Sequence, residues 1–556
     1  MTSSSVYSAL GLGAFIVVVF RLLKKWRTKS PYEYIPGPTS SALGYLLDMH
    51  NPDGLPWHFE MVKKYGHVAR LQGGAIMKDA LYVSDPAALH AVLVRDQHIF
   101  LESDEFAGLF GIIHHGDGVA SVAGAEHKRH RKLMDPVFNN HRMNKLTPLF
   151  YNVVHQLQST LVQEVSGKAP GHTVDILELL TRTSLEMIAQ AGLGHTFNSF
   201  DPQSKDYKDF HWAITSVLPL ASGLFLFMPY FNSWRNIQPV WFRNLLSGAL
   251  AYVPWQTPWQ FKKAVDAMWP IYRTLYAGKM TALEEGGVEA LNNNPTGGED
   301  LMTVLFKANH EAPEADKLSA DAIMANVSSL VHGAQETTSS ILARFIDLLS
   351  QDQDLQTRMR AEIKEATSKK GDGEDLTWSE LNSLPLMDAV IRETFRVFSP
   401  VTFVWRQTIE DTVIPVHYPI RDQQTGLERN ELLVHKGTFL YVGMSAANKS
   451  EVIWGPDAEE FKPERWLAKG GSTVDNTRLP GVYSNMMTFL GGQRACPGMK
   501  FALLEIKLVL SVLLQAFEFH PSGQTIDWRL GITVTPYVRG QEKAGAQVPI
   551  QVKILD

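Results

Sequence analysis

Residues 489–498 read FLGGQRACPG and hold the single cysteine of the 556-residue chain. Gly491 and Gly492 permit a tight loop with positive φ, because glycine lacks the Cβ that disfavours such angles. Cys496 lies just before an apolar stretch that predicts a helix from about residue 500 to 517. Free N–H groups at the start of that helix can donate to a thiolate and lower the thiol pKa.

Two interpretations of this thiol stay open at this point. A lone cysteine is more often a buried hydrophobic side chain than a ligand. The surrounding residues favour a ligand, since Pro497 stiffens the entry to the helix and Gly498 allows the backbone to approach closely. Phe489 can shield the sulfur, and Arg494 can contact an anionic group. We therefore expect Cys496 to be a ligand held in a rigid loop.

The single cysteine also limits the class of protein. It cannot form an internal disulfide or a multi-cysteine zinc or iron–sulfur site, and it agrees with a reducing compartment. Hydrophobic residues make up 45% of the chain and charged residues 20%, which is ordinary for a globular protein. The net charge of −6 gives no electrostatic reason to bind nucleic acid, so no nucleic-acid partner is expected.

The N-terminus predicts a membrane anchor. Residues 6–23 are apolar apart from Arg21, and basic residues follow directly at 24–29. This length approaches the ~20 residues that cross a bilayer. Positive charge after the apolar segment argues against a cleaved signal peptide and places the rest of the chain in the cytosol. We expect an anchor with a basic flank over residues 1–30 and one large domain over 31–556.

Helical patterns dominate the remainder, which predicts a mainly α fold with a minor β part. The longest predicted helix covers about residues 320–349 and is apolar on most sides, which indicates a central, buried position. Thr377 and Glu380 match a capping box before a short helix, and another helix covers about 386–398. Short β-branched runs predict strands at residues 402–404, 438–442 and 532–534.

Two segments have less regular patterns. Residues 213–231 form an uncharged stretch that prolines and a glycine interrupt, and two interpretations stay open, namely burial within the fold or contact with a membrane surface. Residues 284–299 are rich in glycine and asparagine, which predicts a surface loop between helical regions.

The cysteine segment resembles the haem-binding signature of the cytochromes P450, F-x-x-G-x-R-x-C-x-G. The chain matches it at every fixed position, namely Phe489, Gly492, Arg494, Cys496 and Gly498. The resemblance implies one large, mainly α domain that holds haem b between the long central helix and the cysteine loop. It also implies that Cys496 is the axial thiolate ligand of the iron and that O₂ is a co-substrate.

Two further motifs of this family occur in the family's order. Glu393 and Arg396 match its E-x-x-R pair, and a spacing of three places both side chains on one helix face. Residues 461–466, FKPERW, resemble its P-E-R region, so Arg465 is expected to join Glu393 and Arg396. A charged pair alone is usually a solvated helix face. In this order, the three residues imply a buried structural network that supports the cysteine loop.

The predicted central helix carries GAQETT at residues 333–338, which resembles the family pattern [A/G]-G-x-[D/E]-T-[T/S]. Ala334 departs from that pattern, since it stands where the family usually has glycine. In the family, the acid and the alcohol, here Glu336 and Thr337, steady oxygen and relay the protons that promote O–O cleavage. The alternative is ordinary hydrogen bonding of Thr337 to its own helix backbone.

Haem propionates require cations, and the resemblance implies which residues supply them. Residues 127–131 stand where the family has W-x-x-x-R, so Arg131 is an expected propionate partner and His127 replaces the usual tryptophan. Arg406 and Arg494 are further expected partners. Alone, each of these arginines would be read as a surface charge.

A membrane-anchored chain of this kind resembles the endoplasmic-reticulum members of the family. Those members insert one oxygen atom into a C–H or C=C bond, with NADPH electrons delivered by a separate NADPH–cytochrome P450 reductase. We therefore expect a single-pass protein of the endoplasmic-reticulum membrane with a cytosolic catalytic domain. Basic residues suggest its reductase-docking face, namely Lys128, Arg129, Lys132, Lys500 and Lys507.

The insertion at residues 418–431 resembles fungal members, which often act on terpenoids or other secondary metabolites. The predicted pocket lining implies an apolar small-molecule substrate and comprises Phe106, Phe110, Ile112, Ile113, Val331, residues 401–404 and Val534. Two alternatives remain, namely a haem-thiolate isomerase or dehydratase without oxygen activation, and a non-catalytic haem-binding sensor. Thr337 argues against the first, and the Glu336–Thr337 pair argues against the second.

Overall fold

The computed structural model describes residues 30–41, 44–74, 77–169, 171–293, 296–371, 373–467 and 479–555. The predicted membrane-spanning segment, residues 6–23, lies outside the described residues. The chain forms two compact units, each built from separate stretches. The first unit draws on the ranges Met1–Ser103, Val401–Glu460 and Thr473–Ala495, and the second on Asp104–Pro400, Phe461–Ser472 and Cys496–Asp556.

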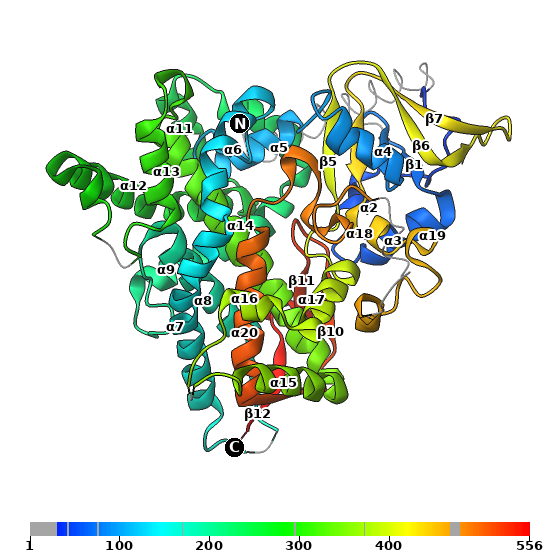
Figure 1. Cartoon of the computed structure of the whole chain (residues 1–556). Coiled ribbons are helices and arrows are strands. Elements are labelled where there is room, and N and C mark those ends of the chain that lie inside the picture. The colour runs from blue at the N-terminus through cyan, green and yellow to red at the C-terminus, as the bar shows by residue number, and fades with distance from the viewer. Residues whose placement is uncertain are drawn as a thin grey trace. The chain divides into compact units, whose positions relative to one another are not determined.

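A five-stranded sheet organises the first unit, in the order β1-β2-β8-β5-β3. β2 and β8 run parallel, with Leu81 opposite Leu440, and the other neighbouring strands are antiparallel. The helix α3 packs against β1 and α18 (Figure 1). The strands are β1 (Val68–Leu71), β2 (Ala80–Val83), β3 (Phe100–Leu101), β5 (Val404–Thr408) and β8 (Phe439–Val442), and the helices are α2 (Leu46–Met49), α3 (Leu55–Tyr65), α4 (Pro86–His90), α18 (Met444–Asn448) and α19 (Glu451–Trp454).

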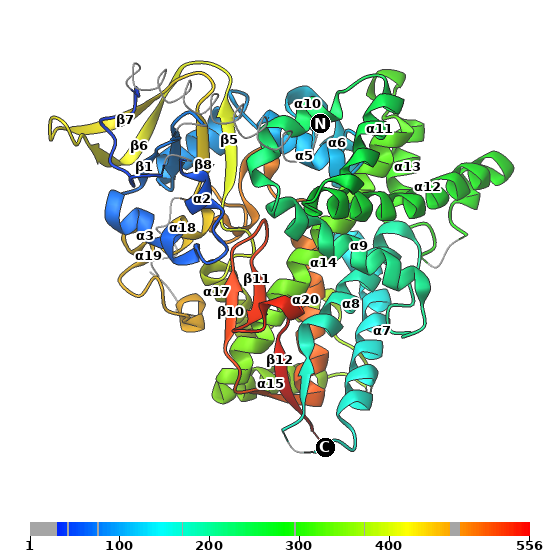
Figure 2. The same cartoon turned by 180° about the vertical axis from the view of Figure 1, so that it is seen from behind.

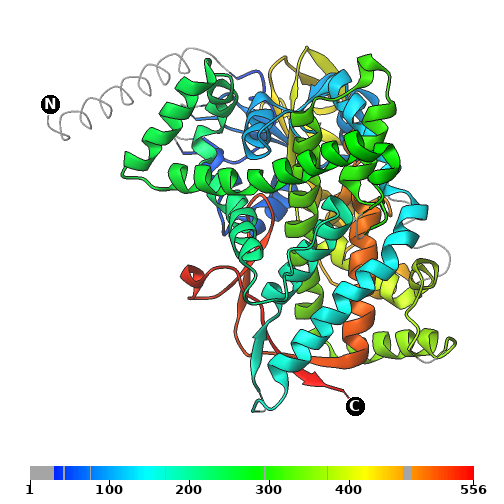
Figure 3. The same ribbon diagram turned by 90° about the vertical axis from the view of Figure 1, so that its left-hand side faces the viewer.

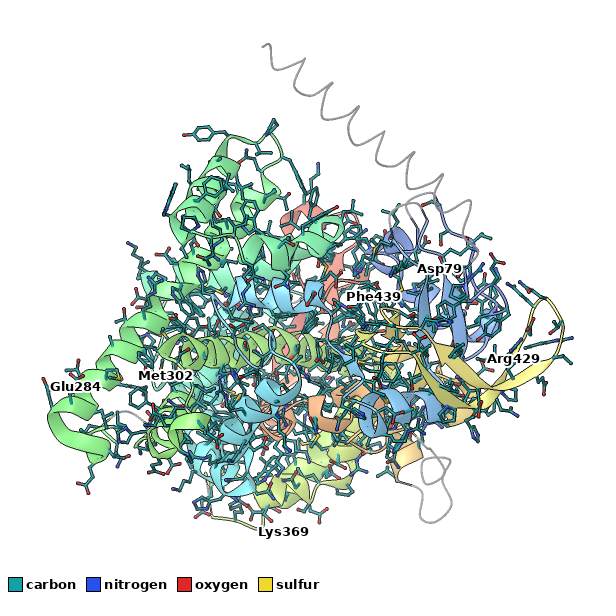
Figure 4. All side chains as sticks on the ribbon, turned by 90° about the horizontal axis from the view of Figure 1, so that it is seen from above. Asp79, Glu284, Met302, Lys369, Arg429 and Phe439 are labelled. Atoms are coloured by element: carbon teal, nitrogen blue, oxygen red, sulfur yellow. The ribbon has the colours of Figure 1, made fainter. Side chains whose placement is uncertain are left out.

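A long hairpin of β6 (Thr412–Arg421) and β7 (Glu428–Val434) also belongs to the first unit. The predicted insertion, residues 418–431, forms its outer end. Asp422 accepts hydrogen bonds from the backbone of the turn and pairs with Arg429 at 2.7 Å. Figure 4 shows Arg429 on this hairpin. The insertion is therefore an ordered turn with its own ion pair.

Helices dominate the second unit. The helices are α5 (Asp104–Ile113), α6 (Gly124–Met134), α7 (Asn140–Val165), α8 (Ile176–Ile188), α9 (Lys205–Ser222), α10 (Phe231–Arg235), α11 (Val240–Ala249), α12 (Thr257–Ala290), α13 (Leu301–Glu311), α14 (Ala320–Gln351), α15 (Gln353–Thr367), α16 (Trp378–Asn382), α17 (Pro385–Val397) and α20 (Met499–Ala516). A polar side chain caps the N-terminus of α7, α8, α9, α13, α14, α15 and α16.

The long helix α14 packs against α8 and α20 in the middle of this unit (Figure 1). Ser319 begins the helix by accepting a hydrogen bond from the backbone N–H of Ala322. Side chains are buried around most of the helix, which confirms its predicted central position. α20 in turn packs along α7, as Figure 3 shows.

Two small sheets complete the second unit. One has the order β4-β12-β9, and the other pairs β10 with β11. Figure 2 shows the C-terminal strands of both sheets in red and orange. Their bounds are β4 (Thr173–Asp175), β9 (Phe517–Pro521), β10 (Ile526–Arg529), β11 (Thr535–Val538) and β12 (Pro549–Ile554). The helix-dominated fold with a minor β part is therefore confirmed.

Several local predictions can be compared with these bounds. The capping box of Thr377 and Glu380 is present at the start of α16. The loop predicted at residues 284–299 is wrong in its first half, because α12 continues to Ala290 with one break in its helical backbone at Gly287.

The predicted strand at 532–534 is also wrong. The strand β11 begins at Thr535, where pairing with β10 places Thr535 opposite Arg529. The strand predicted at 402–404 overlaps the observed one only at Val404, because β5 covers Val404–Thr408, where it pairs with β8. Cross-strand pairing, which short β-branched runs do not reveal, sets the ends of these strands.

Residues 213–231 divide into a buried part and an exposed part. Val217 and Leu218 of α9 are buried, whereas Phe227 and Tyr230 are 48% and 59% exposed. No single helix among the described residues has both the length and the apolar character to cross a membrane. The helical segments Lys205–Ser222 and Phe225–Arg235 satisfy those criteria together, but they bend by 87° where they meet.

Candidate active site

The cysteine lies just before α20, two residues ahead of its N-cap residue Gly498. The Cys496 side chain keeps exposed surface, yet the surrounding protein removes enough water to raise the pKa of its thiol. Hydrogen bonds from the backbone N–H groups of Gly498 and Met499, and the positive charge of Arg131, act in the opposite direction by favouring the thiolate. The two N–H donors and Arg131 therefore offset part of the burial, although the net pKa of the thiol stays raised.

The loop before the cysteine belongs to the first unit and depends on two glycines. Gly492 has a φ of 69°, as predicted, and a Cβ there would overlap the carbonyl group of Leu93. The positive φ predicted for Gly491 is wrong, because this residue is extended, with a φ of −138°, although a Cβ there would overlap the carbonyl group of Pro480. Gly498 differs, since a Cβ on it would lie 3.9 Å from the sulfur, an ordinary contact distance.

Two predicted propionate partners lie together in the first unit. Arg406 is buried on β5, and Arg494 ends a short 3₁₀ turn. Both guanidinium groups bind the carboxylate of Glu102, at 3.1 Å from Arg406 and 2.5 Å from Arg494. The Glu102 side chain is only 6% exposed, so these three side chains form a largely desolvated charged cluster.

Phe489 lies in the same unit, in the turn that precedes the glycines. Its side chain is 7% exposed, and its ring packs edge-on against Tyr483 at 5.5 Å. Asn448 holds this turn by accepting a hydrogen bond from the N–H of Met487 at 2.7 Å and donating one to the hydroxyl of Thr488 at 2.9 Å. A buried amide on α18 therefore positions the first part of the signature.

Helix α6 carries His127 and Arg131 one turn apart in the second unit. His127 is 3% exposed, and the Arg131 side chain keeps about a fifth of its surface, at 21%. His130 on the same helix lies with Nδ1 3.0 Å from Oδ1 of Asn326 on α14. This bond ties α6 to the central helix and helps to hold Arg131 where its charge acts on Cys496.

The charged motif on α17 forms a buried network within the second unit. Glu393 and Arg396 are both fully buried, and Nη2 of Arg396 lies 2.7 Å from Oε1 of Glu393. Nε of Arg465 lies 3.5 Å from the same oxygen. The carboxylate also accepts hydrogen bonds from the backbone N–H of Lys462 at 3.0 Å and the indole N–H of Trp466 at 2.9 Å. The structure brings the three predicted residues together and adds two donors.

The middle of α14 has one accessible face, although most of the helix is buried. Gly333 is exposed, and Ala334 and Thr337 are half-buried, whereas Val331 and Thr338 are buried. A Cβ added at Gly333 would meet no atom within 4 Å. Ala334 therefore adds a methyl group beside this open face without closing it.

The acid and alcohol of α14 have different partners. The hydroxyl of Thr337 donates to the carbonyl oxygen of Gly333 at 2.6 Å, which is the backbone interaction named above as the alternative. Glu336 accepts a hydrogen bond through Oε1 from the hydroxyl of Thr533 at 2.6 Å. Its Oε2 lies 3.6 Å from Nε2 of buried His332. Oε2 of Glu336 and Nε2 of His332 both lack a hydrogen-bond partner among the described residues.

The predicted docking face requires a correction at Lys507. Its side chain is 2% exposed, and its ammonium group binds Asn382 at 2.9 Å and Asp388 at 3.2 Å. Lys507 therefore holds α20 to neighbouring helices and offers no surface to a partner. Sequence alone did not show this, because the predicted helix is apolar around nearly its whole circumference and gives no indication of which side is covered.

The predicted pocket lining requires a correction as well. Ile113 is 1% exposed and Val331 is fully buried, so both belong to the core. Phe106, Phe110 and Ile112 on α5 keep accessible surface. Of the other predicted lining residues, Val401 and Val404 also keep accessible surface, whereas Thr402, Phe403 and Val534 are buried.

The functional residues that the sequence analysis missed are partners of those it found. His332 is four residues before Glu336, a spacing at which helix side chains meet, so its signal was present in the sequence. Glu102, Asn448 and Thr533 gave no such signal, since each binds residues that are distant in the chain.

These residues fit a haem with a thiolate ligand, the group that the resemblance implies. The chemistry of the donor set supports this, because an accessible sulfur carries two backbone N–H donors and a nearby cation. In the same unit, α14 presents an open face without a side chain at Gly333. In the first unit, Arg406 and Arg494 bring two guanidinium groups together, and guanidinium groups bind carboxylates such as a propionate.

Comparison with known proteins agrees with this site. The cytochrome P450 family model matches residues 35–536. Cytochrome P450 monooxygenase 212 of Postia placenta is 36% identical over 549 residues, covering 98% of each chain. A ganoderic acid synthetase of Ganoderma lucidum is 32% identical over 562 residues, covering 100% of this chain and 99% of the relative. The chain thus belongs to the cytochrome P450 family and is a monooxygenase.

Proposed function

We propose that this protein inserts one oxygen atom from O₂ into an apolar small molecule, by hydroxylation or epoxidation, with electrons from NADPH. Residues 31–556 act as the catalytic domain. The observation that carries the proposal is the signature around the only cysteine, where backbone N–H groups and Arg131 partly offset the burial that raises the pKa of its thiol.

The bound haem would supply the oxygen chemistry. Cys496 would hold its iron, and Arg131, Arg406 and Arg494 would bind its propionates, with His127 beside Arg131. Phe489 and Gly498 would flank the sulfur, as in the family signature.

The protein's own proton-handling groups lie on α14. Thr337 offers its oxygen lone pairs at the accessible face, because its hydrogen is used on the Gly333 carbonyl. Glu336 is oriented by Thr533 and can hold a proton at Oε2, facing His332. The buried Glu393 network keeps the segment around Arg465 fixed to α17.

The electron donor is proposed to be NADPH–cytochrome P450 reductase, docking through exposed basic residues. Lys128 and Lys132 of α6 are exposed, and Lys132 also pairs with Asp316 at 2.9 Å. Reversal of Lys128 and Lys500 to glutamate should raise the reductase concentration needed for half-maximal turnover at low salt. Unchanged dependence on reductase and on salt would rule this face out.

We further propose that the protein is anchored in the endoplasmic-reticulum membrane through residues 6–23. Exposed apolar side chains in the second unit support an additional membrane contact, since Phe227, Tyr230, Trp241, Leu245 and Tyr252 are all at least 48% exposed. Microsomes can be extracted with carbonate, which leaves membrane-spanning proteins in the pellet. After removal of residues 1–30, we expect carbonate or high salt to move the protein into the supernatant. A truncated protein that sediments like the full chain after carbonate would contradict the anchor.

The substrate is proposed to be a terpenoid or another fungal secondary metabolite. The relatives support this class only through their names, one of which is a ganoderic acid synthetase. Incubation of the reductase-reconstituted enzyme with a terpenoid panel should give products that contain one atom from ¹⁸O₂. Consumption of NADPH without an oxygenated product from any member would remove this class.

The carbon-monoxide difference spectrum of the reduced protein tests the site itself. The wild type should show the thiolate-type Soret band, and Cys496→Ala should lose it while Gly498→Ala keeps it. A band that is indifferent to Cys496→Ala would refute ligation by this residue. A haem-thiolate isomerase, a dehydratase or a sensor would keep the band but would not consume NADPH in a substrate-dependent way.

A further inference from the structure

A cavity of about 760 Å³ lies within the second unit, among α5, α10, α11 and α12 and the segment between α9 and α10. Its size is typical of small-molecule sites. None of the haem-signature, E-x-x-R or α14 motif residues lines it, but Ile112 of the predicted substrate lining does. Its walls are mainly apolar and aromatic, for example Leu224, Phe231, Trp234, Val253 and Phe261.

The wall formed by α5 and α10 is tightly packed. A Cβ at Gly108 would overlap the backbone of Asn232, and a Cβ at Gly111 would overlap the guanidinium group of Arg235. Two glycines one turn apart therefore let α10 lie directly on α5. This contact fixes Arg235 at the edge of the cavity.

Four of the charged groups around the cavity neutralise one another. Arg235 forms an ion pair with Asp117, and Lys262 forms one with Asp266. His115 also faces Asp266, with Nε2 3.8 Å from Oδ1, and its ring stacks on Trp269. Burial lowers the pKa of His115, so it adds no charge at neutral pH.

Arg243 is the remaining charge. It lies on α11, is half-buried, and donates a hydrogen bond to the backbone carbonyl of Arg235. No carboxylate among the described residues lies within ion-pair distance of it. The cavity thus combines an apolar body with one uncompensated, partly desolvated guanidinium group.

We infer that this cavity binds an amphipathic monocarboxylate, with its carboxylate on Arg243 and its hydrocarbon body against the aromatic walls. A guanidinium group binds a carboxylate through two parallel hydrogen bonds, which an ester or alcohol cannot reproduce. The exposed rims at Phe227 and Tyr230 suit a ligand that is itself amphipathic. The inference rests on these helices and goes beyond the oxygenase activity proposed above.

Photolabelling of the holoenzyme locates the site without reference to turnover. Dodecanoic acid that carries a diazirine at its far end should label peptides within residues 224–266, and excess dodecanoate should prevent the labelling. Ser247→Phe, which places a large ring in the cavity, should abolish the label. Labelling confined to other peptides would overturn the inference.

Isothermal titration with dodecanoate and methyl dodecanoate tests the role of Arg243. Arg243→Gln should weaken dodecanoate binding about tenfold, the value of a charge-assisted hydrogen bond, and change ester binding less than twofold. Arg273→Gln is the matched control, since Arg273 is an exposed arginine on α12 outside the cavity and should change neither. Equal weakening of acid and ester by Arg243→Gln, or equal effects of both variants, would overturn the inference.

The carbon-monoxide spectrum of every variant separates this result from the proposed function. A normal thiolate band with no carboxylate binding removes the cavity assignment alone. An abnormal band in the wild type with intact carboxylate labelling removes the haem assignment alone.

Discussion

Replacement of Glu393 by glutamine tests whether the buried network is a fixed structural support. The change keeps the shape of the side chain and removes its charge. The carboxylate is fully buried and serves Arg396, Arg465, the backbone of Lys462 and the indole of Trp466. A glutamine retains one acceptor oxygen, and its NH₂ group would face guanidinium donors.

The expected cost follows from what the substitution leaves behind. Arg396 has no exposed surface and the Arg465 side chain is 5% exposed, so neither guanidinium can regain its hydration. Removal of one partner from a buried ion pair typically costs about 3–5 kcal/mol. We expect Glu393→Gln to lower the free energy of unfolding by that amount. The double variant Glu393→Met/Arg396→Met should cost about 1–3 kcal/mol less than the sum of its single variants.

Urea unfolding of the holoenzyme, followed by far-UV circular dichroism and by the Soret band, measures these values. Glu464→Gln is a matched control next to the network, because Glu464 is 53% exposed and pairs with Arg358 at 3.2 Å. A surface pair of this kind contributes at most about 1 kcal/mol. If Glu393→Gln and Glu464→Gln shifted the unfolding free energy equally, the network would not be the desolvated support described above.

Three further predictions concern Glu505, Gly492 and Thr337. Burial raises the pKa of Glu505 to about 8, so the folded protein keeps a proton that the unfolded chain loses near pH 4.5. The free energy of unfolding should therefore fall by up to about 1.4 kcal/mol per pH unit between pH 5 and 8. Urea titrations at several pH values should show that Glu505→Gln removes this slope. Parallel pH profiles of the wild type and the variant would contradict the prediction. Gly492→Ala should reduce haem retention after gel filtration, because the added Cβ would overlap the carbonyl of Leu93; full retention would show that the loop can move. Thr337→Val should lower the product formed per NADPH, whereas Thr337→Ser should preserve it; equal coupling in both variants would remove the hydroxyl from the reaction.

The sequence predicted those parts of the site that are local in the chain. The glycine loop, the helix start at Cys496, the Glu393–Arg396 spacing and the capping box at Thr377 each depend on a few consecutive residues. Long amphipathic helices are predictable for the same reason, since their period is expressed over many residues.

The parts that sequence did not predict depend on contacts between distant segments. Glu102 pairs with Arg406 and Arg494, and no pattern near Glu102 signals either partner. Lys507 is as basic as a docking residue, but its side chain is 2% exposed and pairs with Asp388. Burial and pairing are decided by tertiary packing, so a charge seen in a sequence does not show whether it faces a partner protein or the core.

The hydroxyl of Thr337 shows how a structural and a functional role can coexist. A threonine hydroxyl has one hydrogen to donate and two lone pairs that accept. Its hydrogen is used on the carbonyl of Gly333, so toward the accessible face it can only accept. A group that binds Thr337 on that face must therefore bring its own proton, as a water molecule does, while Glu336 holds its free oxygen toward His332. The backbone hydrogen bond thus does not compete with a functional role for Thr337. It makes the hydroxyl oxygen an acceptor on the accessible face, so any proton in that hydrogen bond comes from the bound group.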